Sequence, residues 1–184
     1  MPAVDDKYEL ESIMIPSDDI KRRVRDLASR IESAYRGQEI TLAGVLKGAA
    51  IFMSDLAREI GPTVDVRMDF MAVSSYGNSS TSSGVVKIVK DMDASVEDKH
   101  IILVEDIMDT GLTIAYLKEM LSTRSPRSFK TCVLLEKPER KKVDSEIDYR
   151  GFTIADEFVV GYGLDYAGKW RHLPDIWRLS RAPR

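Results

Sequence analysis

Cysteine and histidine are scarce in this chain of 184 residues, which contains one cysteine and two histidines. A single cysteine excludes an internal disulfide and any metal site built from several cysteines. Cys132 lies within the apolar run 131–135, a setting typical of a buried and unreactive thiol. His100 and His172 stand far apart in the sequence, so we do not expect a histidine-rich zinc centre.

Long apolar segments and a large excess of one charge are also absent. The longest apolar runs are far too short to span a membrane, and residues 1–11 are too acidic for a signal peptide. The net charge is −3 with acids and bases interspersed, which argues against broad electrostatic binding to nucleic acid or an anionic membrane. With 43% hydrophobic residues, the chain can bury the core of one domain. We expect a cytoplasmic protein.

What is present is an alternation of apolar runs with amphipathic segments and no internal repeat. Ser17 is the expected N-cap of a first helix, which is followed by Gly37. Further helices are expected over 49–60 and 114–121, and strands over 40–46, 64–73, 85–89, 101–104, 130–135 and 152–160. This order predicts an α/β fold with a mostly parallel central sheet and helices on both faces. The strands 64–73 and 85–89 are expected to add an antiparallel hairpin.

Residues 101–113, IILVEDIMDTGLT, form the most informative stretch of the chain. Four apolar residues predict a strand buried on both faces. The sequence Thr-Gly-x-Thr at 110–113 predicts a turn into a helix, where free backbone N–H groups and hydroxyls bind phosphate. The acids Glu105, Asp106 and Asp109 would repel that phosphate unless they face ribose hydroxyls, Mg²⁺ or a proton to be removed. Together these groups indicate a phosphorylated ribose as ligand.

This stretch resembles the signature of the type I phosphoribosyltransferases, which bind 5-phosphoribosyl 1-diphosphate. The resemblance extends over about residues 40–177 and implies the fold of that family, with a small hood lobe and a flexible hairpin loop. We expect one domain over 1–184, with a hood formed by about 1–16 and 137–184. The resemblance also implies purine salvage. In that reaction the phosphoribosyl group is transferred to hypoxanthine or guanine, which gives IMP or GMP and pyrophosphate.

The resemblance assigns roles within the signature. Asp109 would be the general base for the purine N7 proton. Glu105 and Asp106 would hold the ribose hydroxyls, directly or through Mg²⁺. Leu112 stands where some relatives have a basic residue, but its backbone N–H remains. The 5′-phosphate would be held by backbone and hydroxyl groups of Asp109, Thr110, Gly111, Leu112 and Thr113.

A second phosphate-binding turn is expected at Lys47-Gly48, between a strand and a helix. In the family that this chain resembles, the matching turn binds pyrophosphate and often carries a non-proline cis peptide, which predicts a cis bond at Leu46–Lys47. The polar segment 74–84 has the composition of a lid. Here Ser75 and Tyr76 match a Ser-Tyr pair that closes over the diphosphate, and Arg171 would also contact pyrophosphate.

The purine site is expected at two further strand ends. Lys137 follows a strand and would donate to the 6-oxo group. Residues 158–166, FVVGYGLDY, resemble the base-binding strand of hypoxanthine-guanine phosphoribosyltransferases. Phe158 would stack on the base and Val159 would read its edge with backbone groups. Asp165, next to the purine, would bind Mg²⁺, so that the expected metal ligands are Asp165, Glu105 and Asp106.

Two alternatives remain open at this point. A regulator with the same fold would sense the sugar diphosphate and bind nucleic acid, but it should carry a basic face or a further domain. An enzyme for another base, such as adenine, xanthine or a pyrimidine, is the second. A lysine donor suits a 6-oxo group and disfavours adenine, whereas the choice among hypoxanthine, guanine and xanthine stays open. Relatives form dimers or tetramers, so a homodimer or homotetramer is expected, without nucleic acid or membrane partners.

Overall fold

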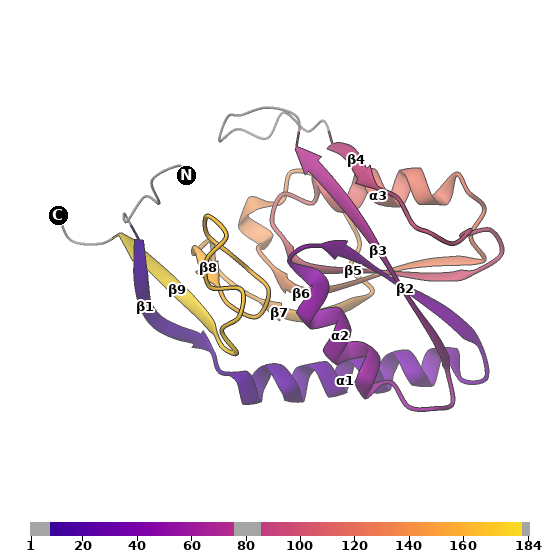
Figure 1. Cartoon of the computed structure of the whole chain (residues 1–184), viewed down its shortest axis with the longest axis horizontal. Helices are drawn as coiled ribbons and strands as arrows, with labels where there is room; N and C mark the ends of the chain where they lie inside the picture. Colours follow the sequence, from indigo (N-terminus) through magenta and orange to yellow (C-terminus); the bar gives the residue numbers. More distant parts are fainter. Residues whose placement is uncertain (1–7, 76–85, 182–184) are drawn as a thin grey trace.

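The computed structural model describes residues 8–75 and 86–181 (Figure 1). Its larger part is a six-stranded sheet in the order β4-β3-β2-β5-β6-β7. All neighbours in this sheet pair in parallel except β3 and β4, which form the expected antiparallel hairpin. The strands are β2 (Glu39–Leu46), β3 (Asp65–Ser75), β4 (Val86–Lys90), β5 (His100–Met108), β6 (Ser128–Glu136) and β7 (Tyr149–Thr153).

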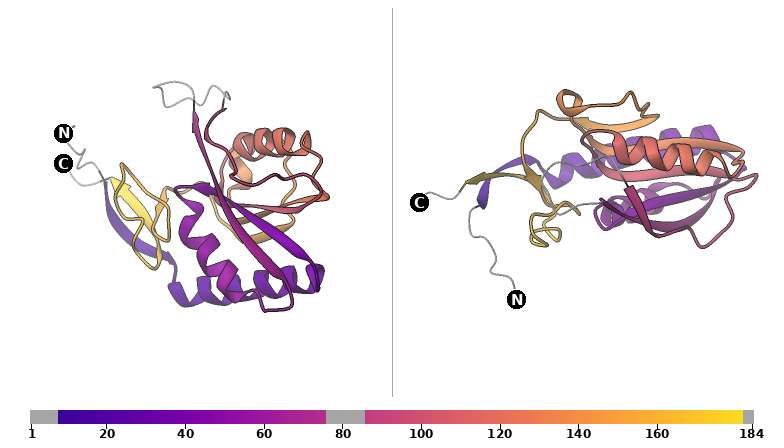
Figure 2. Two further views of the ribbon diagram at one scale, coloured as in Figure 1. Left: turned by 45° about the vertical axis from the view of Figure 1, so that its right-hand side comes forward. Right: turned by 90° about the horizontal axis from the view of Figure 1, so that it is seen from above.

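Helices cover both faces of this sheet, as predicted (Figures 1 and 2). The helices α1 (Ser17–Tyr35) and α2 (Ala49–Glu59) share one buried cluster with Ile40, Leu42 and Ile102. Helix α3 (Leu112–Ser122) packs on the other face, where the buried cluster includes Ala43 and Leu103. Because successive residues of a strand point to opposite faces, the continuous apolar run of β5 supplies both clusters.

A small second sheet lies at one end of the molecule and is built from both ends of the chain. Its order is β1-β9-β8, from β1 (Tyr8–Ile15), β8 (Val159–Val160) and β9 (Ile176–Arg181), and all pairs are antiparallel. The expected hood range of 137–184 therefore includes one strand, β7, that belongs to the large sheet. A short 3₁₀ helix, η1 (Pro138–Arg140), follows β6.

Two details of the predicted elements were wrong. The helix α1 begins at Ser17, and its N-cap is Pro16 rather than Ser17. The free N–H of Ser17 instead donates to Asp175 Oδ1 at 2.7 Å, so a carboxylate from the small lobe caps this helix. The strand expected over 152–160 is two strands, β7 and β8, because the chain leaves the large sheet after Thr153 and enters the small one at Val159.

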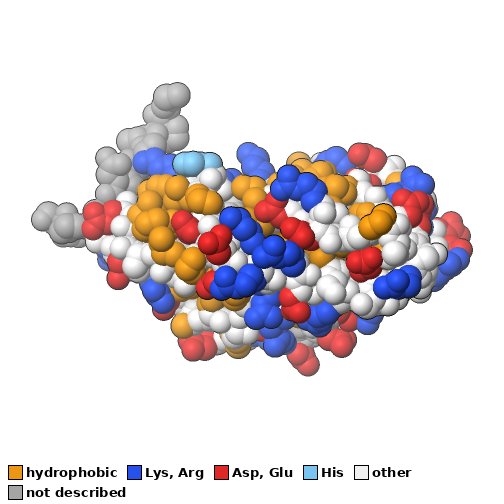
Figure 3. Space-filling view, turned by 90° about the horizontal axis from the view of Figure 1, so that it is seen from below, with side chains coloured by type: hydrophobic (Ala, Val, Ile, Leu, Met, Phe, Trp, Pro, Cys, Tyr) orange, Lys and Arg blue, Asp and Glu red, His pale blue; other side chains and the backbone are white. Residues whose placement is uncertain are grey.

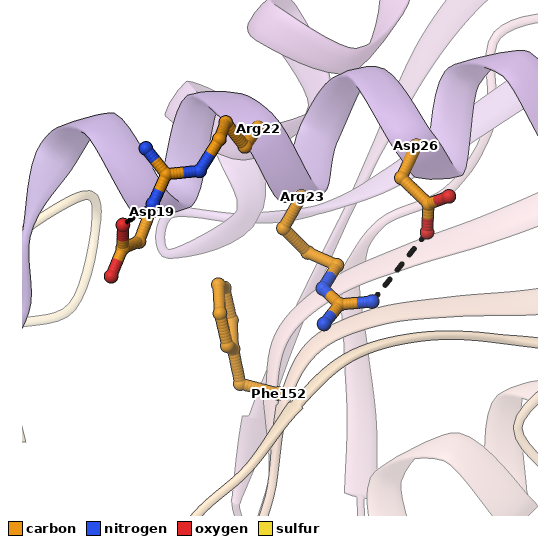
Figure 4. A pocket seen from close by; sticks show the side chains of 5 residues that line it. All are labelled: Asp19, Arg22, Arg23, Asp26 and Phe152. Carbon is orange, nitrogen blue, oxygen red and sulfur yellow. Dashed lines mark hydrogen bonds and ion pairs between the residues drawn. The ribbon is translucent and has the colours of Figure 1, made fainter.

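Helix α1 also contacts the edge strand β7. The guanidinium of Arg23 lies over the ring of Phe152 at 5.3 Å from its centroid, and Arg30 lies over Tyr149 at 5.5 Å. Figure 4 shows Arg23 and Phe152 in a surface pocket, with Asp26 paired to Arg23. The stacked arginines therefore cover the aromatic residues of this edge strand. No helix within the described part of the chain is long and apolar enough to cross a membrane.

Candidate active site

The signature stretch occupies the carboxyl end of β5. Glu105 is buried with 8% of its surface exposed, and burial together with the neighbouring Asp106 raises its pKa well above the usual value. Burial also raises the pKa of Asp106 to about 6, from 3.8 in a free side chain. The nearby Arg171 lowers the pKa of Asp106 and Asp165 raises it, each by a smaller amount than burial does. These two carboxyl groups are costly to ionise here, so the site favours a hydrogen-bond donor or a cation as its ligand.

The expected 5′-phosphate loop leads directly into α3. Gly111 is the N-cap of this helix and has a φ of 80°, a left-handed conformation that glycine adopts without strain. Thr110 Oγ1 accepts a hydrogen bond from the N–H of Leu112 at 3.4 Å. The loop borders a cavity of about 70 Å³, lined by Glu105, Ile107, Met108, Asp109, Thr110, Gly111, Thr113 and Ile114. Helix N-terminus, hydroxyls and a small cavity fit an anion the size of phosphate.

The back of this loop rests on the segment that follows η1. The N–H of Lys142 donates to Thr110 O at 3.0 Å, and the hydroxyl of Ser145 donates to Gly111 O at 3.3 Å. A methyl group added at Gly111 would lie 3.2 Å from Val143 Cγ2. The loop is thus fixed from behind by the segment that follows η1.

The expected pyrophosphate turn lies beside the two acids. The peptide bond Leu46–Lys47 is cis, which confirms that prediction. A methyl group added at Gly48 would overlap the carboxylate of Asp106, so this turn and the end of β5 approach as closely as a glycine permits.

Residues from the small lobe reach the same turn. A methyl group added at Gly163, which has a φ of 103°, would overlap the carbonyl oxygen of Gly48. Arg171 Nη1 donates to Gly163 O at 2.5 Å, and Arg171 also pairs with Asp165. The structure therefore brings together groups that lie more than 100 residues apart in the sequence.

Of the expected purine-binding residues, Lys137 follows β6, and Phe158 and Val159 lie at β8. The ring of Phe158 is 48% exposed, so it is not a core residue, and it stacks on the ring of Tyr8 with centroids 5.9 Å apart. Val159 is buried in β8. Lys137 is buried with 7% exposed, and its Nζ lies 3.5 Å from Asp156 Oδ1. An exposed ring can stack on a flat base, and a buried amine can donate to an oxygen acceptor.

Asp109, the expected general base, has one buried oxygen without a hydrogen-bond partner, Oδ1. This oxygen lies 2.6 Å from Arg140 Nε, an ion pair that lacks hydrogen-bond geometry. Buried acceptors are normally satisfied, and the ion pair with Arg140 is the contact that compensates this oxygen in the structure.

Part of the expected lid cannot be placed. Tyr76 lies outside the described residues, and of Ser75 the structure gives only its backbone position at the end of β3. The role of residues 74–84 as a lid therefore stays a prediction.

The expected Mg²⁺ ligands do not form a protein-only metal site. Within residues 8–75 and 86–181, no group of three or more His, Cys, Asp or Glu side chains could hold a metal by itself. Mg²⁺ usually keeps several waters and is bound by one or two carboxylates together with substrate phosphates. The neighbouring carboxylates of Asp106 and Asp165 fit that manner of binding.

Three residues of this region carried no clear signal in the sequence. Arg140 and Asp156 contact the expected base and the expected lysine, and Gly163 contacts the pyrophosphate turn. The two charged residues look like ordinary surface residues in the sequence because their partners come from other strands. Gly163 belongs to a Gly-Tyr-Gly sequence that suggests only an irregular backbone.

Comparison with known proteins agrees with this geometry. Residues 16–167 match the family model described as phosphoribosyl transferase domain. The chain is 47% identical over 176 residues to a hypoxanthine-guanine phosphoribosyltransferase of Bacillus subtilis, which covers 96% of this chain and 97% of that one. It is 44% identical over 175 residues to the hypoxanthine phosphoribosyltransferase of Escherichia coli K12, with coverages of 94% and 97%. A solved hypoxanthine-guanine phosphoribosyltransferase from Bacillus anthracis has a TM-score of 0.88 at 45% identity and covers 92% of this chain and 99% of its own.

Replacement of Gly163 by alanine tests the contact with the pyrophosphate turn. The added methyl group would displace the Gly48 carbonyl, so Gly163→Ala should weaken binding of 5-phosphoribosyl 1-diphosphate by about 10-fold or more, measured by calorimetry. Gly168→Ala is the matched control, because Gly168 has a φ of 80° and open space around its Cα. Equal losses in the two variants would mean that backbone strain alone, and not the overlap, is responsible.

Replacement of Asp106 by asparagine tests its burial. Because burial raises the pKa of Asp106 from 3.8 to about 6, the folded protein loses stability as the pH rises through this range. In EDTA, Asp106→Asn should therefore be more stable than the parent at pH 7.5, by roughly 1–3 kcal/mol, and the difference should vanish toward pH 4. Urea unfolding at both pH values measures this. Asp144→Asn is the control, since Lys141 lowers the pKa of that exposed carboxyl and its removal should not stabilise. A gain that does not depend on pH would contradict the interpretation.

Proposed function

The chain belongs to the phosphoribosyl transferase domain family, and from this premise we propose that it is a purine-salvage enzyme. It transfers the phosphoribosyl group of 5-phosphoribosyl 1-diphosphate to hypoxanthine or guanine and releases pyrophosphate. The observation that carries the proposal is a set of groups at the strand ends: a loop at a helix N-terminus that borders a small cavity, two buried carboxyl groups, a buried lysine after β6 and an exposed phenylalanine before β8. The relatives named above, two of which act on hypoxanthine and guanine by name, support it.

The reaction forms a bond between C1 of the ribose and a purine nitrogen and breaks the bond from C1 to the diphosphate oxygen. Pyrophosphate leaves with the electron pair of the broken bond, and the purine loses its N7 proton. The transition state resembles an oxocarbenium ion, so the protein mainly positions the two reactants and stabilises the charge that develops on the leaving group.

In the proposed mechanism, each group of residues binds one part of the sugar diphosphate or acts on the base. The loop 109–113 holds the 5′-phosphate, and Glu105 and Asp106 hold the ribose hydroxyls. The turn Lys47-Gly48 and Arg171 hold the pyrophosphate. Asp109 accepts the N7 proton, and its place on the lining of the cavity at this loop supports the role.

On the side of the base, Lys137 donates to the 6-oxo group, Phe158 stacks on the purine and Val159 reads its edge with backbone groups. Ser75 and Tyr76 belong to the proposed lid, which would exclude the water that otherwise hydrolyses the sugar diphosphate.

Mg²⁺ is the proposed cofactor, and when bound it neutralises the diphosphate. Asp165, with Glu105 and Asp106, would hold it. The effect of Asp165 on Asp106 supports this assignment, because Asp165 raises the pKa of Asp106 and a divalent cation would stabilise the charged carboxylate. We further propose a cytoplasmic homodimer or homotetramer.

The alternatives named from the sequence are less well supported. A nucleic-acid-binding regulator should present a broad basic face, whereas on the face in Figure 3 the Lys and Arg side chains lie directly beside Asp and Glu side chains. Such a regulator would also have no use for a buried Lys137 and an exposed Phe158. An adenine enzyme would place a second donor, the 6-amino group, against the amine of Lys137.

A steady-state assay with 5-phosphoribosyl 1-diphosphate, Mg²⁺ and one base at a time tests the proposal. Hypoxanthine and guanine should be converted to IMP and GMP, and adenine should not, because two donors would face each other at position 6. The rate with xanthine measures the breadth of the site. Tight binding of the sugar diphosphate without turnover of any base would favour the regulator instead.

Replacement of Asp109 by asparagine tests its role as base. The side chain keeps its size but can no longer accept a proton, so kcat should fall by about 100-fold or more while IMP binding changes little. Single-turnover rates and calorimetric titration with IMP separate the two quantities. Equal losses in both would assign Asp109 to binding rather than to proton transfer.

A further inference from the structure

Two residues without an assigned role connect the proposed base to the proposed oxo-binding lysine. Arg140 Nε lies 2.6 Å from Asp109 Oδ1, and Arg140 Nη1 lies 3.4 Å from Asp156 Oδ2. Asp156 Oδ1 lies in turn 3.5 Å from Lys137 Nζ. Asp109, Arg140, Asp156 and Lys137 therefore form one row of alternating charge, which we name the charge bridge.

The charge bridge spans the ends of three neighbouring strands. Asp109 follows β5, Lys137 and Arg140 follow β6, and Asp156 follows β7. Backbone hydrogen bonds fix the starting points, since the N–H of Lys137 donates to Met108 O at 3.0 Å and the N–H of Ile154 donates to Glu136 O at 2.9 Å. From these backbone positions onward, the ion pairs of the charge bridge orient the side chains.

Two atoms of a 6-oxopurine correspond to the two ends of the charge bridge. On a 6-oxopurine, N7 and O6 lie next to each other on one edge of the base. A base for N7 and a donor for O6 can act on the same molecule only if the two groups keep a spacing that matches this edge. Displacement by about 1 Å can cost on the order of 100-fold in rate.

Stability is a poor explanation for the bridge. The side chains of Arg140 and Asp156 are 46% and 42% exposed, and ion pairs with that exposure contribute little to folding. A contribution to function is therefore the better account of a bridge whose two ends are both proposed to touch the substrate.

We propose that Arg140 and Asp156 are positioning residues that hold Asp109 and Lys137 at the spacing of the purine N7–O6 edge. This rests on the proposed function, because it takes a 6-oxopurine as substrate. Arg140 orients the carboxylate of Asp109, and Asp156 orients the amine of Lys137. The contact between Arg140 and Asp156 makes the two placements depend on each other.

The experiment measures kcat and the separate KM values for hypoxanthine and for 5-phosphoribosyl 1-diphosphate in Arg140→Met, Asp156→Asn and the double variant. Each single variant should lower kcat/KM for hypoxanthine by between about 10-fold and 100-fold and leave the KM for the sugar diphosphate within about 2-fold. The double variant should lose little more than the worse single one, because the residues act as one unit. Arg140→Lys, which keeps the charge, should recover part of the loss.

The neighbouring ion pair of Lys141 and Asp144, at 2.9 Å, provides matched controls in the same segment. Lys141→Met and Asp144→Asn make the same chemical changes outside the charge bridge and should leave the hypoxanthine kinetics unchanged. Urea unfolding of all variants separates an effect on catalysis from an effect on folding.

Unchanged hypoxanthine kinetics in the two single variants, with an active parent enzyme, would overturn the positioning proposal alone. Losses of equal size in the control variants, or losses that follow the unfolding free energy, would overturn it as well. A parent enzyme that turns over no base would overturn the proposed function and this proposal with it.

Discussion

Parallel pairing of β2, β5, β6 and β7 is the constraint on which the rest of this structure depends. In this register Gly44 of β2 faces Val104 of β5, and Val104 faces Cys132 of β6, so the strands end close to one another. Each strand then gives its polar residues to the same edge of the sheet, as open α/β sheets do. For that reason the turn at 47–48, the acids at 105–106 and the lysine at 137 all lie at this edge of the sheet.

At this edge of the sheet, burial makes it unfavourable for carboxyl groups to ionise. Glu105 and Asp106 lie near the end of the buried apolar strand β5, and burial raises the pKa of both. Ligands that bring hydroxyl donors or a cation offset this cost, whereas a phosphate beside these acids would increase it. The proposed phosphate site lies a few residues later, at the N-terminus of α3. Glu105 also lines the cavity at this loop, so a single strand-to-helix connection would serve both proposed ligands.

The small lobe contacts the larger part of the molecule at helix α1 and at the turn 47–48. Its strands come from both ends of the chain, and Asp175 from this lobe caps α1 at Ser17. Gly163 approaches Gly48 so closely that only a glycine fits, and Arg171 holds Gly163 by its carbonyl. The lobe is therefore bound to the sheet at the very turn that is proposed to hold pyrophosphate. A ligand in that turn contacts both parts of the molecule.

The sequence by itself determined the α/β class, the strand run 101–104, the turn into a helix at 110–113 and the hairpin, because these follow from local periodicity and turn chemistry. It also predicted the cis bond at Leu46–Lys47 through a family resemblance. It did not predict the break between β7 and β8, because apolar periodicity does not show which sheet a strand joins. Only the tertiary structure decided that Arg140 meets Asp109, that Asp156 meets Lys137 and that Gly163 meets Gly48. Such contacts join residues from different strands, and their geometry depends on how the sheet and the small lobe pack rather than on any local pattern.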